Sequence, residues 1–391
     1  MLDTIVLTLS KGMYIITDPD RFTPSARWAT DNAPLLGTSS FISSKQNPLK
    51  RELRAGNYKP RLTVTQRFNH ARRYEATLKV ELSLPKLMFN NNFDELMDTD
   101  FDNVAKLLQE KLKEMGVLVF WELLINAPVS AIHYSKNIPL TDGSTPYSYI
   151  KHIRQANITA RLDTNQTDYR NEGHSFKLHA NSYEISFYDK IKDLQIARSK
   201  GIKRAVDRDS DIQLSLFDQL EKRDFFEVLR MEVRLNRRQK MKPLFKQLGI
   251  ESELTFQHLF SSQIAQKVLL HYLDYVEQQR PALLDFKPKS NKDLIAQLMI
   301  HNSQLKPRKI LQLVGLKNIM DSMGMREVRS VFGNRLSQCT WYSLVRETKD
   351  VALPLQTSPF SKIRSHLQQF EPLKLVDFQE RMLNNDKNET Y

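Results

Sequence analysis

Four segments of the sequence carry ionisable or hydroxyl side chains at alternate positions, the pattern of β-strands with one apolar and one polar face. These segments are residues 77–84, 129–135, 183–190 and 228–235. If they belong to one sheet, helices cover the apolar faces and the polar faces meet on the other side. The polar face would then gather the following side chains: Lys79, Glu81, His133, Tyr188, Lys190, Arg230, Glu232 and Arg234.

Three of these side chains have the chemistry of metal ligands. The carboxylates of Glu81 and Glu232 together with the imidazole of His133 can hold Mg²⁺ or Mn²⁺, because oxygen ligands suit hard divalent ions. A metal ion held there would polarise the phosphate of a phosphodiester. We therefore expect Glu81, His133 and Glu232 to be the metal ligands.

A tyrosine on the same face would supply a nucleophile. Its hydroxyl can attack phosphorus and store the bond as a phosphotyrosine, while basic side chains such as Lys190 stabilise the charge that builds up. Strand alternation puts Tyr188 on the polar face and Tyr183 on the apolar face, so Tyr188 is the predicted nucleophile. The alternative is an ordinary solvated sheet face on which Glu81 and Glu232 pair with neighbouring Lys and Arg.

The chain of 391 residues is too long for one ordinary core, and we expect two domains and a tail. Strands mixed with helices predict an α+β fold, an antiparallel-rich sheet covered by helices on one face, over residues 1–245. Residues 246–350 are expected to form a mainly helical domain that could bind DNA, and residues 351–391 a C-terminal tail. Within the second part, residues 306–332 could form a helix-turn-helix with Lys309, Arg326 and Arg329 facing phosphates, or part of a plain helical bundle.

The net charge of +13 is the excess expected of a nucleic-acid binder, although an anionic protein partner or a solubility bias would also explain it. Basic residues are densest between 230 and 246, where Arg230, Arg234, Arg237 and Arg238 could follow a DNA backbone, together with Lys79. The single cysteine, the lack of a transmembrane stretch and a first segment that reads as a strand predict a cytoplasmic protein without membrane partners.

The same segments resemble the gene II/gene X family of replication initiators from filamentous phages and related plasmids. The resemblance rests on residues 1–9, 79–86, 90–96, 129–137, 187–190 and 230–234, and it covers residues 1–245 better than the rest. It implies that Tyr188 forms the covalent bond to the 5′ phosphate at a nick in origin DNA. The free 3′ hydroxyl then primes a host polymerase with the help of a host helicase, and the enzyme later rejoins the displaced strand.

The resemblance also implies that Glu81 and Glu232 are metal ligands, and that His133 stands where some relatives have an acidic residue. The broader class of rolling-circle nickases often has a His-hydrophobic-His pair on one strand, and this sequence has none at 131–135. His174 and His179 are five residues apart, so we expect them to contact DNA or to be structural. The leading expectation is a metal-dependent origin nickase that acts on duplex and single-stranded DNA in the bacterial cytoplasm. One alternative is a non-enzymatic DNA-binding protein, such as a repressor or a single-strand binder. Another is an RNA-processing or recombination enzyme.

Overall fold

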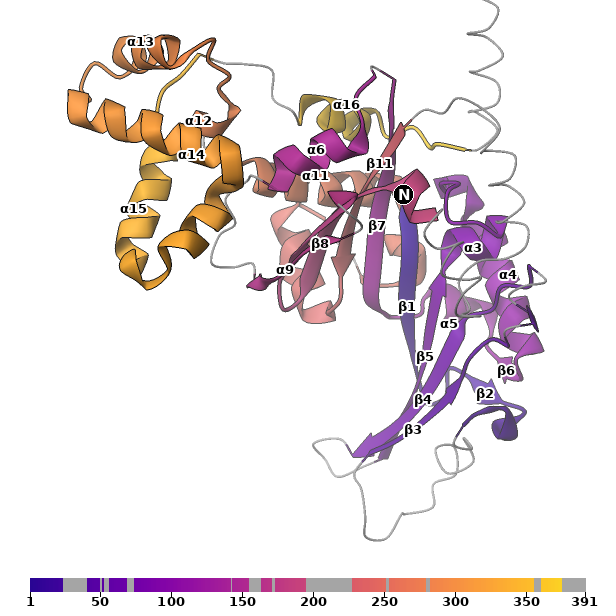
Figure 1. The fold of residues 1–391 in the computed structure, drawn as a ribbon. Coiled ribbons are helices and arrows are strands. Elements are labelled where there is room, and N and C mark those ends of the chain that lie inside the picture. The colour runs from indigo at the N-terminus through magenta and orange to yellow at the C-terminus, as the bar shows by residue number, and fades with distance from the viewer. Residues whose placement is uncertain are drawn as a thin grey trace, which may run out of the picture.

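The computed structural model describes residues 1–23, 41–49, 51–52, 56–68, 74–141, 143–154, 163–170, 173–194, 227–250, 253–278, 282–354 and 360–374. Its largest element is a nine-stranded antiparallel sheet with the order β3-β4-β5-β1-β7-β11-β10-β9-β8 (Figure 1). The strands are β1 (Leu2–Ser10), β3 (Phe41–Gln46), β4 (Arg61–Phe68), β5 (Tyr74–Ser83), β7 (Val129–Leu140), β8 (Asp163–Arg170), β9 (Ser175–His179), β10 (Tyr183–Asp189) and β11 (Glu227–Leu235). A second, two-stranded sheet pairs β2 (Ile15–Ile16) with β6 (Val117–Leu118).

One face of the large sheet carries the apolar core. Alternate residues of β1, such as Ile5, Leu7 and Leu9, are fully buried on this face, as are Val233 and Leu235 of β11. They share one hydrophobic cluster with residues of the helices that pack on the sheet. These helices are α3 (Leu84–Phe89), α4 (Phe101–Glu114), α5 (Trp121–Ile125), α9 (Arg238–Gln247), α10 (Phe256–Leu259), α11 (Ser262–Gln278) and α16 (Ser361–Gln369). A further helix, α6 (Pro146–Arg154), contacts β9, β10 and β11.

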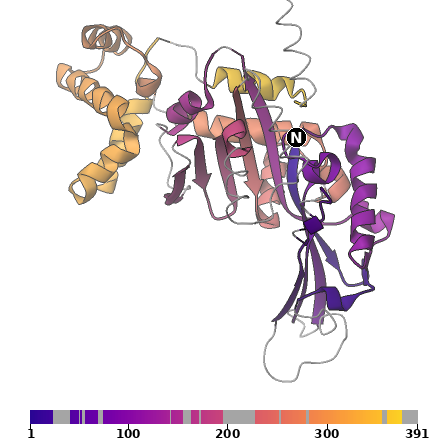
Figure 2. The same cartoon turned by 45° about the vertical axis from the view of Figure 1, so that its right-hand side comes forward.

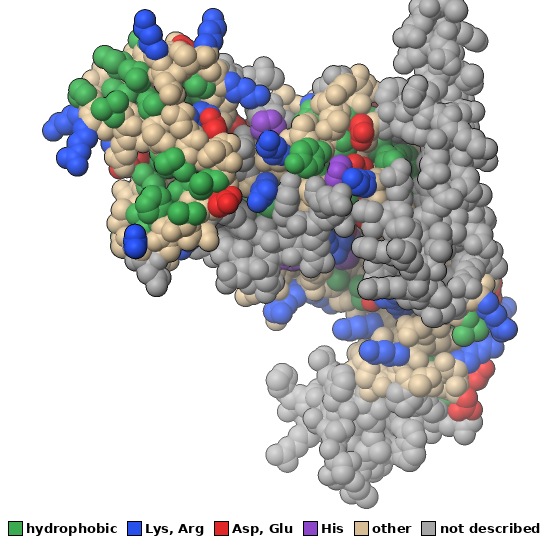
Figure 3. Space-filling view, in the orientation of Figure 1, with side chains coloured by type: hydrophobic (Ala, Val, Ile, Leu, Met, Phe, Trp, Pro, Cys, Tyr) green, Lys and Arg blue, Asp and Glu red, His purple; other side chains and the backbone are tan. Residues whose placement is uncertain are grey.

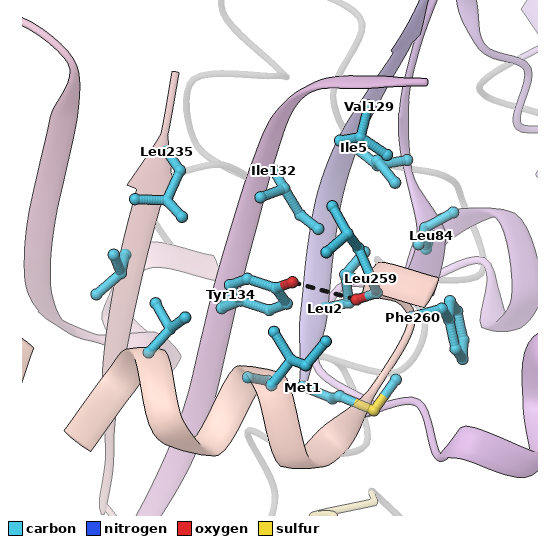
Figure 4. Packing of buried hydrophobic residues seen from close by; sticks show 14 of the residues in the cluster. Met1, Leu2, Ile5, Leu84, Val129, Ile132, Tyr134, Leu235, Leu259 and Phe260 are labelled. Carbon is cyan, nitrogen blue, oxygen red and sulfur yellow. Dashed lines mark hydrogen bonds between the residues drawn. The ribbon is translucent and has the colours of Figure 1, made fainter. Parts of the chain in front are cut away.

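Tyr134 on β7 fixes the segment before α11 to the middle of this core. Its ring is fully buried, and its hydroxyl donates a hydrogen bond to the carbonyl oxygen of Leu259 at 3.1 Å (Figure 4). Because the polar tip of a buried tyrosine needs a partner, this bond sets where α10 ends against the sheet.

Residues beyond α11 form a second core of their own. It is built from α12 (Ala282–Asp285), α13 (Asn291–His301), α14 (Pro307–Phe332) and α15 (Gln338–Lys349), which lie to one side of the sheet in Figures 1 and 2. Leu294 and Leu298 of α13 and Met320 of α14 are fully buried in this cluster. We call these four helices the helical domain.

The two cores divide the chain differently from the predicted boundaries. Residue 245 falls inside α9, and α9 to α11 bury their apolar residues against the sheet, so the sheet domain extends to Gln278. The predicted tail also contributes to the sheet domain, because Ile363 and Leu367 of α16 are fully buried in the core of the sheet. Residues 375–391 of that tail lie outside the described part of the chain.

The predicted fold class is confirmed: the chain is α+β, with an antiparallel sheet and a helical C-terminal region. Among the described residues, no helix has both the length and the apolar character needed to cross a bilayer.

The separate core of the helical domain predicts a separate unfolding transition. Leu298→Ala should destabilise that domain by about 2–5 kcal/mol, because it removes a fully buried side chain and leaves a cavity. Scanning calorimetry should show the helical transition moving to lower temperature while the sheet transition stays in place. Leu311→Ala, at an exposed position of α14, is the matched control and should move neither transition; a single peak shifted by both variants would contradict the two-core description.

Candidate active site on the polar face of the sheet

The register of four adjacent strands decides which polar side chains lie together. Residues directly opposite one another on neighbouring strands project to the same face. From β7 through β11 and β10 to β9, the three rows are His133, Arg234, Glu184 and His179; then Ser135, Glu232, Ser186 and Lys177; then Asn137, Arg230, Tyr188 and Ser175. We call the face that carries these rows, opposite the apolar core, the polar face.

The carboxylate of Glu232 lies at the centre of this face and is almost fully buried, at 1% exposure. The hydroxyl of Tyr188 donates a hydrogen bond to its Oε2 at 2.9 Å, and Nε of Arg234 donates one to its Oε1 at 2.7 Å. The Nδ1 atom of His133 lies 3.7 Å from the same Oε1. The predicted nucleophile, Tyr188, and the predicted ligand His133 therefore both lie beside the carboxylate of Glu232, which is itself a predicted ligand.

Asp3 of β1 completes a group that could hold a metal ion. Asp3, His133 and Glu232 each offer one ligand atom, and these atoms all lie within 4.8 Å of one another. Asp3 reaches the group because the pairing of β1 with β7 shifts register between Leu2 and Thr4, so that Asp3 is an extra residue at a bulge. Bulges commonly re-aim a side chain in this way.

Glu81 does not belong to this group, contrary to the prediction. On β5 it pairs with Val6 of β1, which in turn pairs with Ala131, so a whole strand separates Glu81 from β7. Its side chain is 52% exposed and lies 4.0 Å from Arg61. The structure thus replaces Glu81 with Asp3 as the second carboxylate of the triad.

Arg230 is an internal residue, although we predicted that it would contact DNA from the surface. It is 2% exposed, and its guanidinium donates hydrogen bonds to Oδ1 of Asp3 at 3.1 Å, to Oγ of Ser135 at 2.7 Å and to the carbonyl oxygen of Asn92 at 2.7 Å. Its role in the structure is to hold Asp3 beside the other two members of the triad.

The charges around Glu232 keep it ionised. Burial by itself would raise the pKa of Glu232, but the positive charges of Arg234 and Arg230, with the hydrogen bond from Arg234, outweigh this and hold the pKa far below its ordinary value. Burial lowers the pKa of His133 more strongly than Glu232 raises it, so the imidazole is neutral near pH 7, the form that binds metals. Burial, aided by the charge of Glu232, raises the pKa of Tyr188 well above its ordinary value, so its hydroxyl keeps the proton that it donates.

Lys190 directly follows β10 and is 1% exposed. Its Nζ lies 5.9 Å from the centre of the Tyr188 ring. Burial, together with the charge of Arg230, lowers the pKa of Lys190 to about 7. The predicted basic residue thus lies beside the predicted nucleophile, and near neutral pH it can either hold a proton or release one.

The other predicted DNA contacts differ in their surroundings. Lys79 on the polar face of β5 and Arg237 and Arg238 at the start of α9 are exposed. Arg234 is partly exposed, but it is paired with Glu232 and, through Nη1 at 3.3 Å, with Oε1 of Glu184. Only the first three are therefore exposed basic groups of the kind that binds phosphates.

His174 and His179, which we expected to contact DNA or to be structural, both lie beside carboxylates. Nδ1 of His174 lies 3.1 Å from Oδ2 of Asp189, and Nδ1 of His179 lies 2.9 Å from Oε2 of Glu184. Neither belongs to the triad that could hold a metal.

The helix-turn-helix prediction requires a turn after Gly315, and the structure has none there. α14 is helical through Gly315 and departs from helical geometry at Gly324, where φ is 79° and ψ is 160°. Lys309 pairs with Glu347, and the guanidinium of Arg329 lies over the ring of Trp341 at 5.8 Å. The side chain of Arg326 lies outside the described part of the structure. Figure 3 shows that Lys and Arg side chains nevertheless surround apolar patches on the visible face of this domain.

Sequence reasoning missed Asp3, although the sequence carries a signal for it. Buried residues of β1 fall at Leu2, Ile5, Leu7 and Leu9, so the two-residue spacing is interrupted once, at Asp3 and Thr4. An interruption of this kind in an alternating strand indicates a bulge. The sequence around Glu81 carries no comparable signal that Glu81 lies outside the triad, because its strand alternates regularly.

Comparison with protein-family models, with curated proteins and with solved structures finds no match for the chain.

The buried charge of Lys190 predicts a pH-dependent cost in stability. Since the pKa of Lys190 is lower in the folded than in the unfolded protein, folding is penalised fully below pH 7, and the penalty disappears as the pH rises towards 10.5. Lys190→Met should therefore increase the free energy of unfolding at pH 7 by a few kcal/mol, an order-of-magnitude expectation from the linkage relation. Urea unfolding at pH 7 and at pH 10 measures this gain, which should be smaller at pH 10. Destabilisation at both pH values would show that the ammonium group is instead well satisfied.

The triad makes a second prediction, which separates the structural from the sequence-based choice of ligands. Asp3→Asn should weaken Mn²⁺ binding by at least tenfold, since it removes a charged oxygen ligand, whereas Glu81→Gln should leave it unchanged. Isothermal titration calorimetry with Mn²⁺ measures both variants against the unaltered chain. Equal loss in the two variants would return Glu81 to the site.

Proposed function

We propose that the polar face is the active site of a metal-dependent DNA nickase that uses Tyr188 as its nucleophile and initiates rolling-circle replication. The observation that carries this proposal is the contact between the Tyr188 hydroxyl and Glu232, which is also a member of the Asp3, His133 and Glu232 triad. A nucleophile and a metal-ligand set joined through one carboxylate are what phosphodiester cleavage by a tyrosine requires.

The triad fits a divalent ion such as Mg²⁺ or Mn²⁺. It offers two carboxylate oxygens and a neutral imidazole, a donor set suited to Mn²⁺ and tolerated by Mg²⁺. When bound, the ion would polarise the scissile phosphate and favour the negative charge that forms on its oxygens. Arg230 would hold Asp3 in position through its hydrogen bond to Oδ1.

The proton balance of the attack follows from the proton affinities beside Tyr188. As Oη of Tyr188 forms its bond to phosphorus, its proton passes to the neutral amine of Lys190, whose pKa of about 7 suits a general base near neutral pH. The bond from phosphorus to the 3′ oxygen breaks, and Lys190 returns that proton to the leaving oxygen. Glu232 orients the Tyr188 hydroxyl through the hydrogen bond that its Oε2 accepts. Reversal of these steps by a free 3′ hydroxyl rejoins the strand and restores Tyr188.

The charges near Tyr188 and Glu232 explain why a divalent ion would also promote substrate binding. The acidic groups are Asp3, Glu184, Asp193 and Glu232, and the basic groups are Lys177, Lys190, Arg230 and Arg234. With Lys190 protonated these charges balance, so an added divalent ion would leave an excess of positive charge. That excess would attract the phosphate backbone of DNA.

The resemblance to phage and plasmid initiators supports origin DNA as the substrate, with a host polymerase and helicase as partners. The net charge of +13 and the exposed Lys79, Arg237 and Arg238 are consistent with a DNA backbone near the sheet. The alternative function is non-enzymatic DNA binding by a repressor or single-strand binder. That alternative gives no reason to place a tyrosine against a buried carboxylate and beside a buried lysine at a cost in stability.

Removal of the nucleophile tests the proposal. Tyr188→Phe should reduce nicking of supercoiled DNA that carries the origin, in the presence of Mn²⁺, by at least a thousandfold, and should abolish the covalent protein–DNA adduct. Mass spectrometry of the adduct formed by the unaltered chain should locate the nucleotide on Tyr188. Tyr183→Phe is the matched control, because Tyr183 lies on the same strand but on the apolar face.

The contradicting results are equally definite. Unchanged nicking by Tyr188→Phe, or an adduct on another residue, would remove Tyr188 from the reaction. Tight DNA binding with no nicking under any metal condition would favour the non-enzymatic alternative.

A further inference from the structure

A cluster of charged side chains around Glu184 lies on the polar face beside the proposed site and takes no part in the mechanism above. Three basic groups surround this carboxylate: Nζ of Lys177 at 3.3 Å, Nδ1 of His179 at 2.9 Å and Nη1 of Arg234 at 3.3 Å. The hydroxyl of Ser186 also donates to Glu184 at 3.1 Å. We call Lys177, His179, Glu184 and Arg234 the Glu184 cluster.

The Glu184 cluster brings three basic groups to one nearly buried carboxylate. Burial would raise the pKa of Glu184, but Arg234, Lys177 and His179 outweigh it, so Glu184 is ionised and contributes a single negative charge. Lys177 and Arg234 each bring a basic side chain to Glu184. Arg234 is shared with Glu232, and a metal ion on the triad would compete with it for that carboxylate. Arg234 would then depend more on Glu184, and the positive charges of Lys177 and Arg234 would be less fully compensated by Glu184 and Glu232.

The basic groups are accessible, whereas the carboxylate that holds them is not. Lys177, His179 and Arg234 have side chains that are 21–31% exposed, and Glu184 is 11% exposed. Glu184 therefore lies beneath three basic groups that reach solvent on one face of the sheet. This arrangement orders long side chains in advance and lowers the entropy cost of binding an anion.

The position of the cluster suits a second phosphate of the same DNA strand. Glu184 precedes Tyr188 by four residues on β10, so the two side chains share a face and their backbones lie about 14 Å apart along the strand. Arg234, which is bonded to both Glu232 and Glu184, lies between the Tyr188 hydroxyl and the rest of the cluster. A single strand that presents one phosphate to Tyr188 can run along β10 and reach the cluster with another.

We propose that the Glu184 cluster is a phosphate-binding subsite for single-stranded DNA, in which Lys177, His179 and Arg234 bind a backbone phosphate that flanks the one attacked by Tyr188. Glu184 holds these groups in place and competes with the phosphate for them. The inference rests on the proposed function for the identity of the ligand.

Two substitutions with opposite expected effects test the subsite. Lys177→Met removes a basic group and should weaken binding of oligothymidylate about fivefold, with the slope of log affinity against log salt reduced by about 0.7. Glu184→Gln keeps the shape but removes the competing charge, so it should strengthen binding about threefold. The measurement is fluorescence anisotropy of a labelled oligothymidylate of about 20 nucleotides, longer than one single-strand binding site. All variants carry Tyr188→Phe, so that no covalent adduct forms.

A control and a folding measurement accompany the pair. Lys106→Met replaces an exposed lysine on α4, which packs on the apolar side of the sheet, and should not change the affinity. Thermal melting verifies that each variant is folded, and His179→Gln replaces Lys177→Met if the latter is not. Weaker or unchanged binding by Glu184→Gln, or unchanged binding by Lys177→Met, would overturn the subsite and leave an internal ion cluster.

The proposed function is tested separately by the adduct on Tyr188 in the otherwise unaltered chain. If the adduct forms but the two affinities do not move in opposite directions, the subsite fails and the nickase stands. If the affinities move as expected but no adduct forms, the subsite stands as part of a single-strand binding face and the nickase fails.

Discussion

The buried carboxylate of Glu232 is the interaction on which the polar face depends. An ionised group at 1% exposure is stable only where hydrogen bonds and opposite charges replace its water. Tyr188 on β10, Arg234 on β11 and His133 on β7 provide these, so three neighbouring strands converge on two oxygen atoms. Any loss of register among these strands would leave a charge buried without partners, which makes the arrangement rigid.

The apolar face makes this rigidity possible. Helices α9 to α11 and α16 bury a continuous hydrophobic layer against the centre of the sheet, and this layer fixes the strands from the other side. Glu95 ties several segments together near the same strands. It accepts hydrogen bonds from Lys136, from the backbone N–H of Asn137 at 2.7 Å and from the backbone N–H of Leu373 at 2.9 Å. The segment before Glu95 also supplies the Asn92 carbonyl that accepts from Arg230, so the residues after α16 support the site from outside the sheet.

The polar face contains groups that a protein optimised only for stability would avoid. Lys190 is buried with a lowered pKa, and the buried Nε of Arg230 has no hydrogen-bond partner in the described part of the structure. Tyr188 keeps its proton beside a negative carboxylate. Costs of this kind concentrate where proteins perform chemistry, because perturbed proton affinities and preorganised charges are what reactions use. Here they lie around the same hydroxyl and carboxylate, which favours one site over several unrelated ion pairs.

The sequence by itself determined the properties that depend on local alternation. It separated Tyr188 from Tyr183, placed His133 and Glu232 on polar faces and predicted an antiparallel-rich sheet followed by helices, because side-chain direction in a strand repeats every two residues. The tertiary structure decided the rest. The order of the strands put β1 between Glu81 and His133, and a bulge at Leu2 to Thr4 brought in Asp3 instead. The pairing of β11 with β7 buried Arg230, and the return of α16 to the sheet made a predicted tail part of the core. Apart from the bulge, at which the alternation of β1 is interrupted, these features depend on contacts between residues far apart in the chain, which periodicity within a single segment does not encode.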